Sequence, residues 1–178
     1  NKAKINDDIY VSGNLGDSYL GLLVLKNKIK LNHKLKKYFI NQYFMPNVQL
    51  KLIDQIKKIA NTSIDISDGL LADVNKMINN QKLSYKLFLQ DIPISNNLKK
   101  ILDLKKLSKI NYISNGDDYQ VLFTASKNKM RIIRKIASNC RVRLTKIGSI
   151  QSHAEKSSII DDKNRQITLK NKGYFHKF

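Results

Sequence analysis

The stretch SIDISDGLLADV, residues 63–74, joins a short strand to a helix and places oxygen-bearing side chains at the junction. Apolar residues alternate with Asp65 and Ser67, a pattern typical of a strand with one buried side. Apolar residues from Leu70 onward instead recur at helical spacing and predict a helix over residues 70–78. The turn between the two elements therefore brings Asp65, Ser67 and Asp68 to the beginning of a helix.

Two interpretations of this junction stay open. The first N–H groups of a helix lack partners, so Ser67 or Asp68 can serve as an N-cap, a contribution of about 1 kcal/mol. One cap needs only one such side chain, however, and carboxylates crowded together repel each other unless a cation lies among them. Mg²⁺ prefers hard oxygen ligands of this kind and usually binds together with nucleotide phosphates. The second interpretation is thus a Mg²⁺ site at the beginning of the helix.

A second acidic stretch, ISNGDDYQVLF, occupies residues 113–123. Asn115 and Gly116 form a strong turn signal, and Asp117 and Asp118 follow directly before an apolar strand. This pattern fits an Asx-type turn that leads into a buried strand. It also fits a functional alternative in which Asp117 faces the same pocket as the carboxylates of the first stretch.

Apolar spacing along the rest of the chain predicts strands and helices that interleave. Strands are expected at residues 9–12, 84–90, 118–125 and 142–150, and helices at residues 19–28, 31–45, 48–60, 98–107 and 129–139. SSIIDDKNRQITL, residues 157–169, has a strand, a polar turn and a strand, which predicts a C-terminal β-hairpin and argues against a purely parallel sheet. The predicted fold class is therefore α+β, a mixed α/β sandwich with helices packed on a sheet, in a single domain over residues 1–178.

The chain is strongly basic, with 33 Lys and Arg against 14 Asp and Glu and a formal net charge of +19. Nucleic-acid binding is nevertheless not expected, because Arg is scarce beside Lys and the lysines are spread along the polar sides of amphipathic segments. No apolar run is long enough to cross a bilayer, so no membrane partner is expected. The single cysteine, Cys140, predicts a reducing, cytoplasmic setting.

Five segments in a fixed order resemble a known family. They are NDDIYVSGNLGDSYLGL (6–22), IDISDGLLADV (64–74), SNGDDYQVLF (114–123), KIGSI (146–150) and GYFHKF (173–178). Together they resemble the C-terminal half of thiamine-monophosphate kinase, a family related to aminoimidazole-ribonucleotide synthetase and selenophosphate synthetase. The resemblance covers nearly the entire chain, and it implies a fold of the C-terminal domain type of that superfamily.

The resemblance also implies an activity and a set of site residues. Enzymes of this family transfer the γ-phosphoryl group of ATP onto the phosphate of thiamine monophosphate, with Mg²⁺, and form thiamine diphosphate. On the matching positions, Asp65 and Asp68 are expected to bind Mg²⁺ and Ser67 to contact ATP. Asp117 is expected near the thiamine substrate, and Tyr174 is expected to pack on it. No general base is required, because the acceptor is already an anionic phosphate oxygen.

The sequence also departs from the family pattern. Asp117 and Gln120 stand where the family usually has Glu, and Lys177 separates the closing His176 from Phe178. The family's N-terminal half, which supplies further acidic metal ligands, much of the ATP site and most of a homodimer interface, has no counterpart here. The chain is therefore expected to be a fragment or a shortened relative, with little or no kinase activity alone and without the family's dimer contacts. The alternative is a non-catalytic degenerate relative or a basic binding module.

Overall fold

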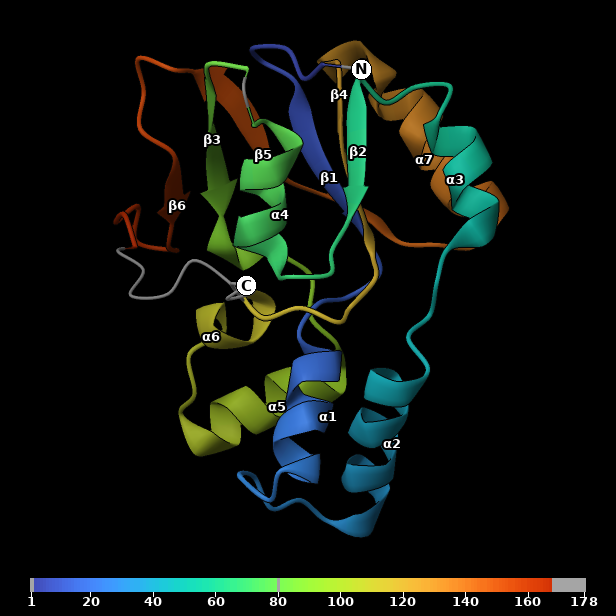
Figure 1. Cartoon of the computed structure of the whole chain (residues 1–178), viewed down its shortest axis with the longest axis vertical. Coiled ribbons are helices and arrows are strands. Elements are labelled where there is room, and N and C mark those ends of the chain that lie inside the picture. The colour runs from blue at the N-terminus through green and yellow to red at the C-terminus, as the bar shows by residue number, and fades with distance from the viewer. Residues whose placement is uncertain (1, 80, 168–178) are drawn as a thin grey trace, which may run out of the picture.

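A computed structural model of the chain describes residues 2–79 and 81–167, which form a mixed six-stranded sheet with helices on both faces and beyond one end (Figure 1). The strands are β1 (Asp8–Ser12), β2 (Thr62–Asp65), β3 (Leu83–Phe88), β4 (Val121–Ala125), β5 (Leu144–Ser152) and β6 (Ser158–Ile160). The helices are α1 (Asp17–Leu25), α2 (His33–Phe44), α3 (Leu50–Ile56), α4 (Leu70–Met77), α5 (Asn96–Lys105), α6 (Ile110–Ile113) and α7 (Met130–Cys140), with short 3₁₀ helices η1 (Leu89–Asp91) and η2 (Lys127–Lys129).

The strand order is β2-β4-β1-β5-β3-β6, and every neighbouring pair is antiparallel except β3 and β6, which are parallel. The central strand β1 is buried along its whole length, and its side chains point alternately to the two faces. Ile9 and Val11 pack on one face, whereas Tyr10 packs on the other, where its ring stacks on that of Phe123 at a centroid distance of 5.3 Å.

Separate helices cover these two faces. Helix α4 lies across the face of Ile9 and Val11, to which it contributes an apolar side that includes Leu70 and Val74. Helices α3 and α7 cover the opposite face beside β2 and β4 (Figure 1). Burial of these apolar surfaces on both sides of one sheet is what makes the sandwich stable.

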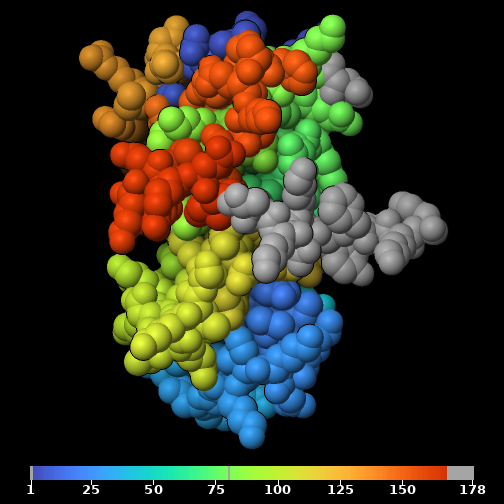
Figure 2. Space-filling model, turned by 90° about the vertical axis from the view of Figure 1, so that its left-hand side faces the viewer, coloured from blue at the N-terminus to red at the C-terminus, as the bar shows by residue number. Residues whose placement is uncertain are grey.

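A third apolar cluster joins α1, α2, α5 and α6 beyond the end of the sheet (Figure 1). Helices α1 and α2 approach each other very closely there, because a Cβ atom on Gly21 would lie only 2.2 Å from the Phe39 carbonyl oxygen. The α2 and α5 helices begin at side-chain caps, since Asn32 accepts a hydrogen bond from the Leu35 N–H and Ser95 accepts one from the Leu98 N–H, both at 3.0 Å. Figure 2 shows this layer from the side: its blue and yellow-green segments lie together beyond the orange and red segments that include β5 and β6.

The predicted fold class is confirmed, and each predicted strand and helix corresponds to an observed element, apart from the second strand of the predicted C-terminal hairpin. Helix α6 was not predicted, because its four residues are too few to show a helical period. At the predicted C-terminal hairpin, β6 turns back through residues 161–165, and a single bridge joins Ile160 to Gln166 within the described residues. No helix in the described part of the chain combines the length and apolar character needed to span a membrane.

Candidate functional site

The two acidic stretches lie side by side because the β2–β4 pairing continues past the ends of both strands. Backbone hydrogen bonds join Ile66 N–H to the Gln120 carbonyl at 2.9 Å, Tyr119 N–H to the Ile66 carbonyl at 2.9 Å and Asp117 N–H to the Ser67 carbonyl at 3.0 Å. The loop of residues 115–119 is thereby held against the turn before α4. This contact brings Asp117 next to Ser67 and Asp68, although the two stretches are far apart in the sequence.

Gly116 allows this close contact. A Cβ atom at that position would lie 1.6 Å from the Ser67 carbonyl oxygen and 2.9 Å from the Asp68 Cα atom, so any other residue would push the two segments apart. Both obstructing atoms belong to the backbone and cannot move away as a flexible side chain could. The glycine of the Asn-Gly turn signal is therefore required by the close approach of the neighbouring segment, because its own φ is not positive.

The loop that carries Asp117 has an unusual backbone. Asp117 has φ of 68° and Tyr119 has φ of 51°, so two residues without glycine's freedom adopt the left-handed region on either side of Asp118. Such conformations cost free energy and persist only where the surroundings fix them, which is common at functional sites. Here the hydrogen bonds to residues 66 and 67 provide that fixation.

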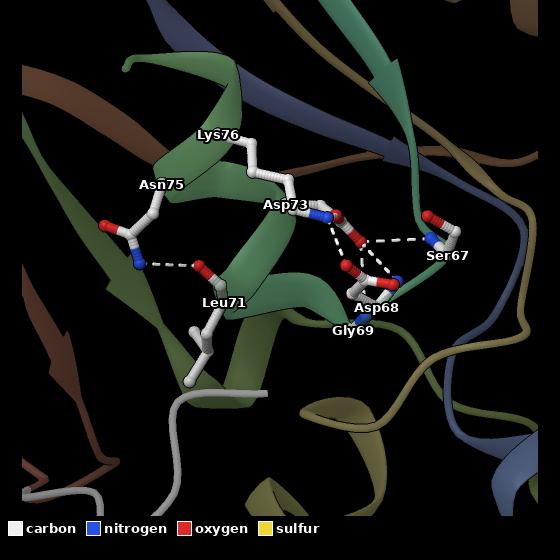
Figure 3. Close-up of polar contacts among 7 residues, drawn as sticks. All are labelled: Ser67, Asp68, Gly69, Leu71, Asp73, Asn75 and Lys76. Carbon is white, nitrogen blue, oxygen red and sulfur yellow. Dashed lines mark hydrogen bonds and ion pairs between the residues drawn. The ribbon is translucent and has the colours of Figure 1, made fainter. Parts of the chain in front are cut away.

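The turn before α4 is organised by Asp73, a residue inside the helix. One carboxylate oxygen of Asp73, Oδ2, accepts hydrogen bonds from the N–H groups of Ser67 and Asp68 at 3.0 Å and of Gly69 at 3.1 Å (Figure 3). The Asp73 side chain is fully buried. The capping interpretation of Ser67 and Asp68 is therefore wrong: the N-cap residue is Gly69, it makes no side-chain cap, and the N–H groups of residues 67–69 donate to a carboxylate one turn into the helix.

The Asp68 side chain pairs with a cation and does not cap α4. Asp68 forms an ion pair with Lys76, whose ammonium also donates to Asp73 Oδ1 at 3.1 Å (Figure 3). Lys76 is half exposed, and it supplies a positive charge to the carboxylates at this end of the helix. Asp65, at the last position of β2, is exposed, as the predicted alternation with buried isoleucines requires.

The charges of the site influence one another. Burial raises the pKa of Asp117 above its ordinary value, and the negative charge of Asp68 raises this pKa further. The negative charge of Asp68 thus disfavours ionisation of Asp117, and a cation between the two side chains would remove that penalty. Among the described residues, no three or more His, Cys, Asp or Glu side chains are already arranged to hold a metal ion. Asp68 and Asp117 could supply two oxygen ligands to a hard cation, which would require further ligands from elsewhere.

Asp118 points to the opposite side of the loop from the exposed surface and is buried. Its Oδ2 atom accepts a hydrogen bond from the Gly16 N–H at 2.8 Å, at the beginning of α1. Burial raises the pKa of the Asp118 carboxyl to about 8, and the nearby Asp17 adds to the rise. The carboxyl therefore connects the loop of residues 115–119 to α1 in a form that is largely neutral at pH 7.

Gln120 is also fixed beneath this loop. Its Oε1 atom accepts from the Ser12 hydroxyl at 2.8 Å, and its Nε2 atom donates to the Asn47 carbonyl at 3.3 Å. An amide can accept and donate at once, whereas an ionised carboxylate can only accept. Gln120, which stands where the family usually has Glu, therefore makes two contacts here that an ionised Glu could not both make.

The structure joins the loops that carry three of the predicted site residues, while a fourth precedes them along the chain and the fifth is not among the described residues. Ser67, Asp68 and Asp117 lie on the two joined loops, Asp65 ends the strand directly before them, and Tyr174 lies outside the described residues. Asp73 and Asp118 were missed as organising residues. An acidic residue in the first turn of the predicted helix was a usable signal for Asp73, whereas nothing local distinguishes Asp118 from Asp117.

Comparisons with known proteins reveal relatives along nearly the whole chain. No family model matches the chain. The chain is 35% identical over 176 residues to the thiamine-monophosphate kinase of Buchnera aphidicola subsp. Acyrthosiphon pisum, a match that covers 98% of this chain and 54% of that protein. The chain is similar to half of a thiamine-monophosphate kinase. The enzyme of that name from Escherichia coli K12 is 29% identical over 175 residues, again with 98% of this chain and 53% of the relative covered. The chain thus spans about half the length of the curated relatives it matches.

Solved structures show the same relationship. The crystal structure of thiamine-monophosphate kinase from Stenotrophomonas maltophilia K279a superposes with a TM-score of 0.77 and 25% identity, over 91% of this chain and 52% of that one. A structure of AaThiL complexed with AMPPCP and TMP gives a TM-score of 0.78 and 28% identity, over 98% and 53%. E. coli HypE, at a TM-score of 0.69 and 15% identity, over 93% and 50%, shares the fold alone. The predicted resemblance to thiamine-monophosphate kinase is confirmed, and its extent is consistent with the C-terminal half.

Proposed function

We propose that this chain forms part of an ATP-dependent kinase that phosphorylates thiamine monophosphate to thiamine diphosphate. The observation that carries the proposal is the backbone pairing of residues 66–67 with residues 117–120, which places Asp117 against the turn that carries Ser67 and Asp68. Similarity over 98% of the chain to thiamine-monophosphate kinases supports the same conclusion, as does a related structure named for its complex with AMPPCP and TMP.

Each site residue then has a role that its chemistry allows. Asp65 and Asp68 would bind Mg²⁺, Ser67 would contact ATP, and Asp117 and Tyr174 would face the thiamine substrate. When bound, Mg²⁺ neutralises phosphate charge and orients the phosphoryl group for transfer. The protein's own contribution is positioning: Asp73 fixes the backbone of the turn that carries Ser67 and Asp68 through hydrogen bonds from their N–H groups.

Lys76 compensates the charge of Asp68 in the absence of a bound cation. Its exposed side chain makes this pair easy to exchange, since ion pairs near water are weak. Asp68 would therefore transfer from an ammonium partner to a metal ion at little cost. We also propose a cytoplasmic setting for the protein, as predicted from its single cysteine.

The site as described is one part of a larger one. The chain spans about half the length of the relatives, and its carboxylates supply only part of a metal's ligand shell. The remaining ligands and much of the nucleotide contact would come from the part of the relatives that this chain does not match. We expect negligible turnover of Mg-ATP and thiamine monophosphate by the 178 residues alone, and efficient turnover would contradict this division of the site.

A metal titration tests the site without requiring turnover. Mn²⁺, a paramagnetic substitute for Mg²⁺, should broaden the ¹H–¹⁵N signals of residues 65–69 and 116–118 in the unchanged chain. Asp68→Asn should weaken this broadening at least about tenfold, because it removes one charged ligand. Asp54→Asn, which removes an exposed carboxylate on α3, is the matched control and should leave it unchanged. Broadening centred elsewhere, or unaffected by Asp68→Asn, would remove Asp68 from the metal site.

Activity is tested by joining this chain to the unmatched half of the Buchnera aphidicola relative. Formation of thiamine diphosphate by the chimera, followed by chromatography, would support the proposal if Asp68→Asn abolishes it and Asp54→Asn does not. A chimera that is active with either substitution would show that the chemistry does not depend on the turn before α4.

A further inference from the structure

A cavity unrelated to this site lies between η1, α5 and the chain just before β5. Its volume is about 440 Å³, within the range of small-molecule sites. Three cationic side chains line it, Lys99 from α5, Lys109 from the segment before α6 and Arg143 from the residue before β5. Neither Asp68 nor Asp117 belongs to its lining, so the proposed kinase chemistry leaves the cavity unused.

Lys109 is fixed in place by the backbone. Its ammonium donates to the Leu89 carbonyl at 2.7 Å and to the Gln90 carbonyl at 3.4 Å, so its position on the cavity wall is set by the chain segment at η1. An ammonium has three donors, which leaves capacity for a further acceptor. The pKa of Lys109 is lowered to about 8, mainly by burial; the charge of Asp91 opposes this shift, and the charges of Lys99 and Arg143 add to it. Lys99 and Arg143 are thus close enough to Lys109 to repel its ammonium.

The three cations lack the ion pairs that would relieve this repulsion. The ion pairs found over residues 2–79 and 81–167 involve Lys76, Lys146 and Arg165, and none includes Lys99, Lys109 or Arg143. Asp91 and Asp103 also line the cavity, so its lining keeps one net positive charge. Neither carboxylate forms an ion pair with the three cations within 4.0 Å.

The remaining wall of the cavity is apolar. Pro93 and Ile92, which follow η1, and Leu102 of α5 contribute side chains to the lining. A ligand that satisfies the whole cavity would therefore combine an anionic group with an apolar part. Phosphate is the anion best matched to several convergent ammonium and guanidinium donors, because it offers multiple charged acceptor oxygens.

We propose that this cavity binds a small phosphate-bearing molecule, whose phosphate contacts Lys99, Lys109 and Arg143 and whose apolar part packs against the segment after η1 and against α5. The site is distinct from that of the proposed kinase reaction, and it does not depend on the reaction being correct.

Titrations followed by ¹H–¹⁵N spectra of the chain test the proposal. The probe is phenyl phosphate, which joins a phosphate to an apolar ring, and benzyl alcohol is the neutral counterpart. We expect saturable shifts of the amides of residues 89–94, 109 and 143 with phenyl phosphate and none with benzyl alcohol. Inorganic phosphate should shift the same amides with weaker affinity, because it lacks the apolar part.

Charge-removing variants then separate a site from general attraction to a basic chain. Lys99→Met and Arg143→Met should each raise the dissociation constant about fivefold, the loss of one charge contact near water. Lys100→Met removes the same charge from the next residue of α5, which is exposed and outside the cavity lining, and should leave the constant within about twofold. Lys109 is not replaced in this test, because its ammonium also donates to two backbone carbonyl groups and its loss could disturb the segment at η1.

Two results would overturn the proposal. One is the absence of saturable shifts around the cavity up to about 20 mM phenyl phosphate, a concentration well above typical weak-ligand constants. The other is an equal effect of Lys99→Met and Lys100→Met, which would reduce the binding to the overall charge of +19. Loss of binding in both cavity variants, with the control unchanged, would establish the site.

Discussion

Replacement of Asp73 by Ala is the most informative single change in this chain. One oxygen of this fully buried carboxylate accepts three backbone hydrogen bonds, from residues 67, 68 and 69, at 3.0–3.1 Å. Ala removes all three acceptor contacts at once. The same change also removes one of the two carboxylates that hold Lys76.

The magnitude follows from the burial of the three donors. Gly69 is buried, so its unpaired N–H would cost about 1–3 kcal/mol of the free energy of unfolding. Ser67 and Asp68 are half-buried, and water can partly replace the lost acceptor, so each would cost roughly 0.5–1 kcal/mol. The lost pair with Lys76 adds little, because the half-exposed ammonium can bind water and keeps Asp68 as a partner. We expect Asp73→Ala to lower the free energy of unfolding by about 2–5 kcal/mol and Asp73→Asn, which keeps one acceptor oxygen, by less.

Urea unfolding followed by circular dichroism measures this change, and amide hydrogen exchange of residues 67–69 localises it. Asp54→Ala, which removes an exposed carboxylate from another helix, is the control and should change the free energy of unfolding by no more than about 0.5 kcal/mol. If Asp73→Ala stays within about 1 kcal/mol of the unchanged chain, with exchange at residues 67–69 as slow as before, the internal cap does not organise the turn.

Two further changes test the loop that carries Asp117. In Gly116→Ala the new Cβ atom would lie 1.6 Å from the Ser67 carbonyl oxygen, so we expect the two loops to separate. The free energy of unfolding in urea should fall by about 3 kcal/mol or more, and the amide shifts of residues 66–68 should change. Unchanged shifts there would refute the close contact. For Asp118, a folded-state pKa of about 8 against an ordinary value of 3.8 means that the folded chain holds a proton that the unfolded chain releases, so stability falls as pH rises between these values. Asp118→Asn cannot ionise, and its stability relative to the unchanged chain should therefore increase between pH 5 and pH 8 in unfolding titrations; a difference that is constant with pH would contradict the buried, neutral carboxyl.

Much of the architecture could be predicted from local patterns. The alternation around Asp65 and the helical spacing after Leu70 predicted β2 and α4 on the correct sides of the turn. Such patterns succeed because burial of one face imposes a period on the sequence, whether or not the partner surface is known. The Asn115-Gly116 signal likewise predicted a turn, since short polar and glycine residues favour turns locally.

The sequence by itself therefore determined the elements, the approximate positions of the acidic stretches and a resemblance to one family of kinases. Only the tertiary structure decided that Gly116 makes room for Ser67, that Asp73 rather than Ser67 or Asp68 satisfies the turn, and that Lys99, Lys109 and Arg143 share a cavity. These relations depend on hydrogen bonds and charges between segments that are far apart in the sequence, and no periodic pattern of residues links such segments. Local patterns record which side of an element is buried, and they do not record what lies against it.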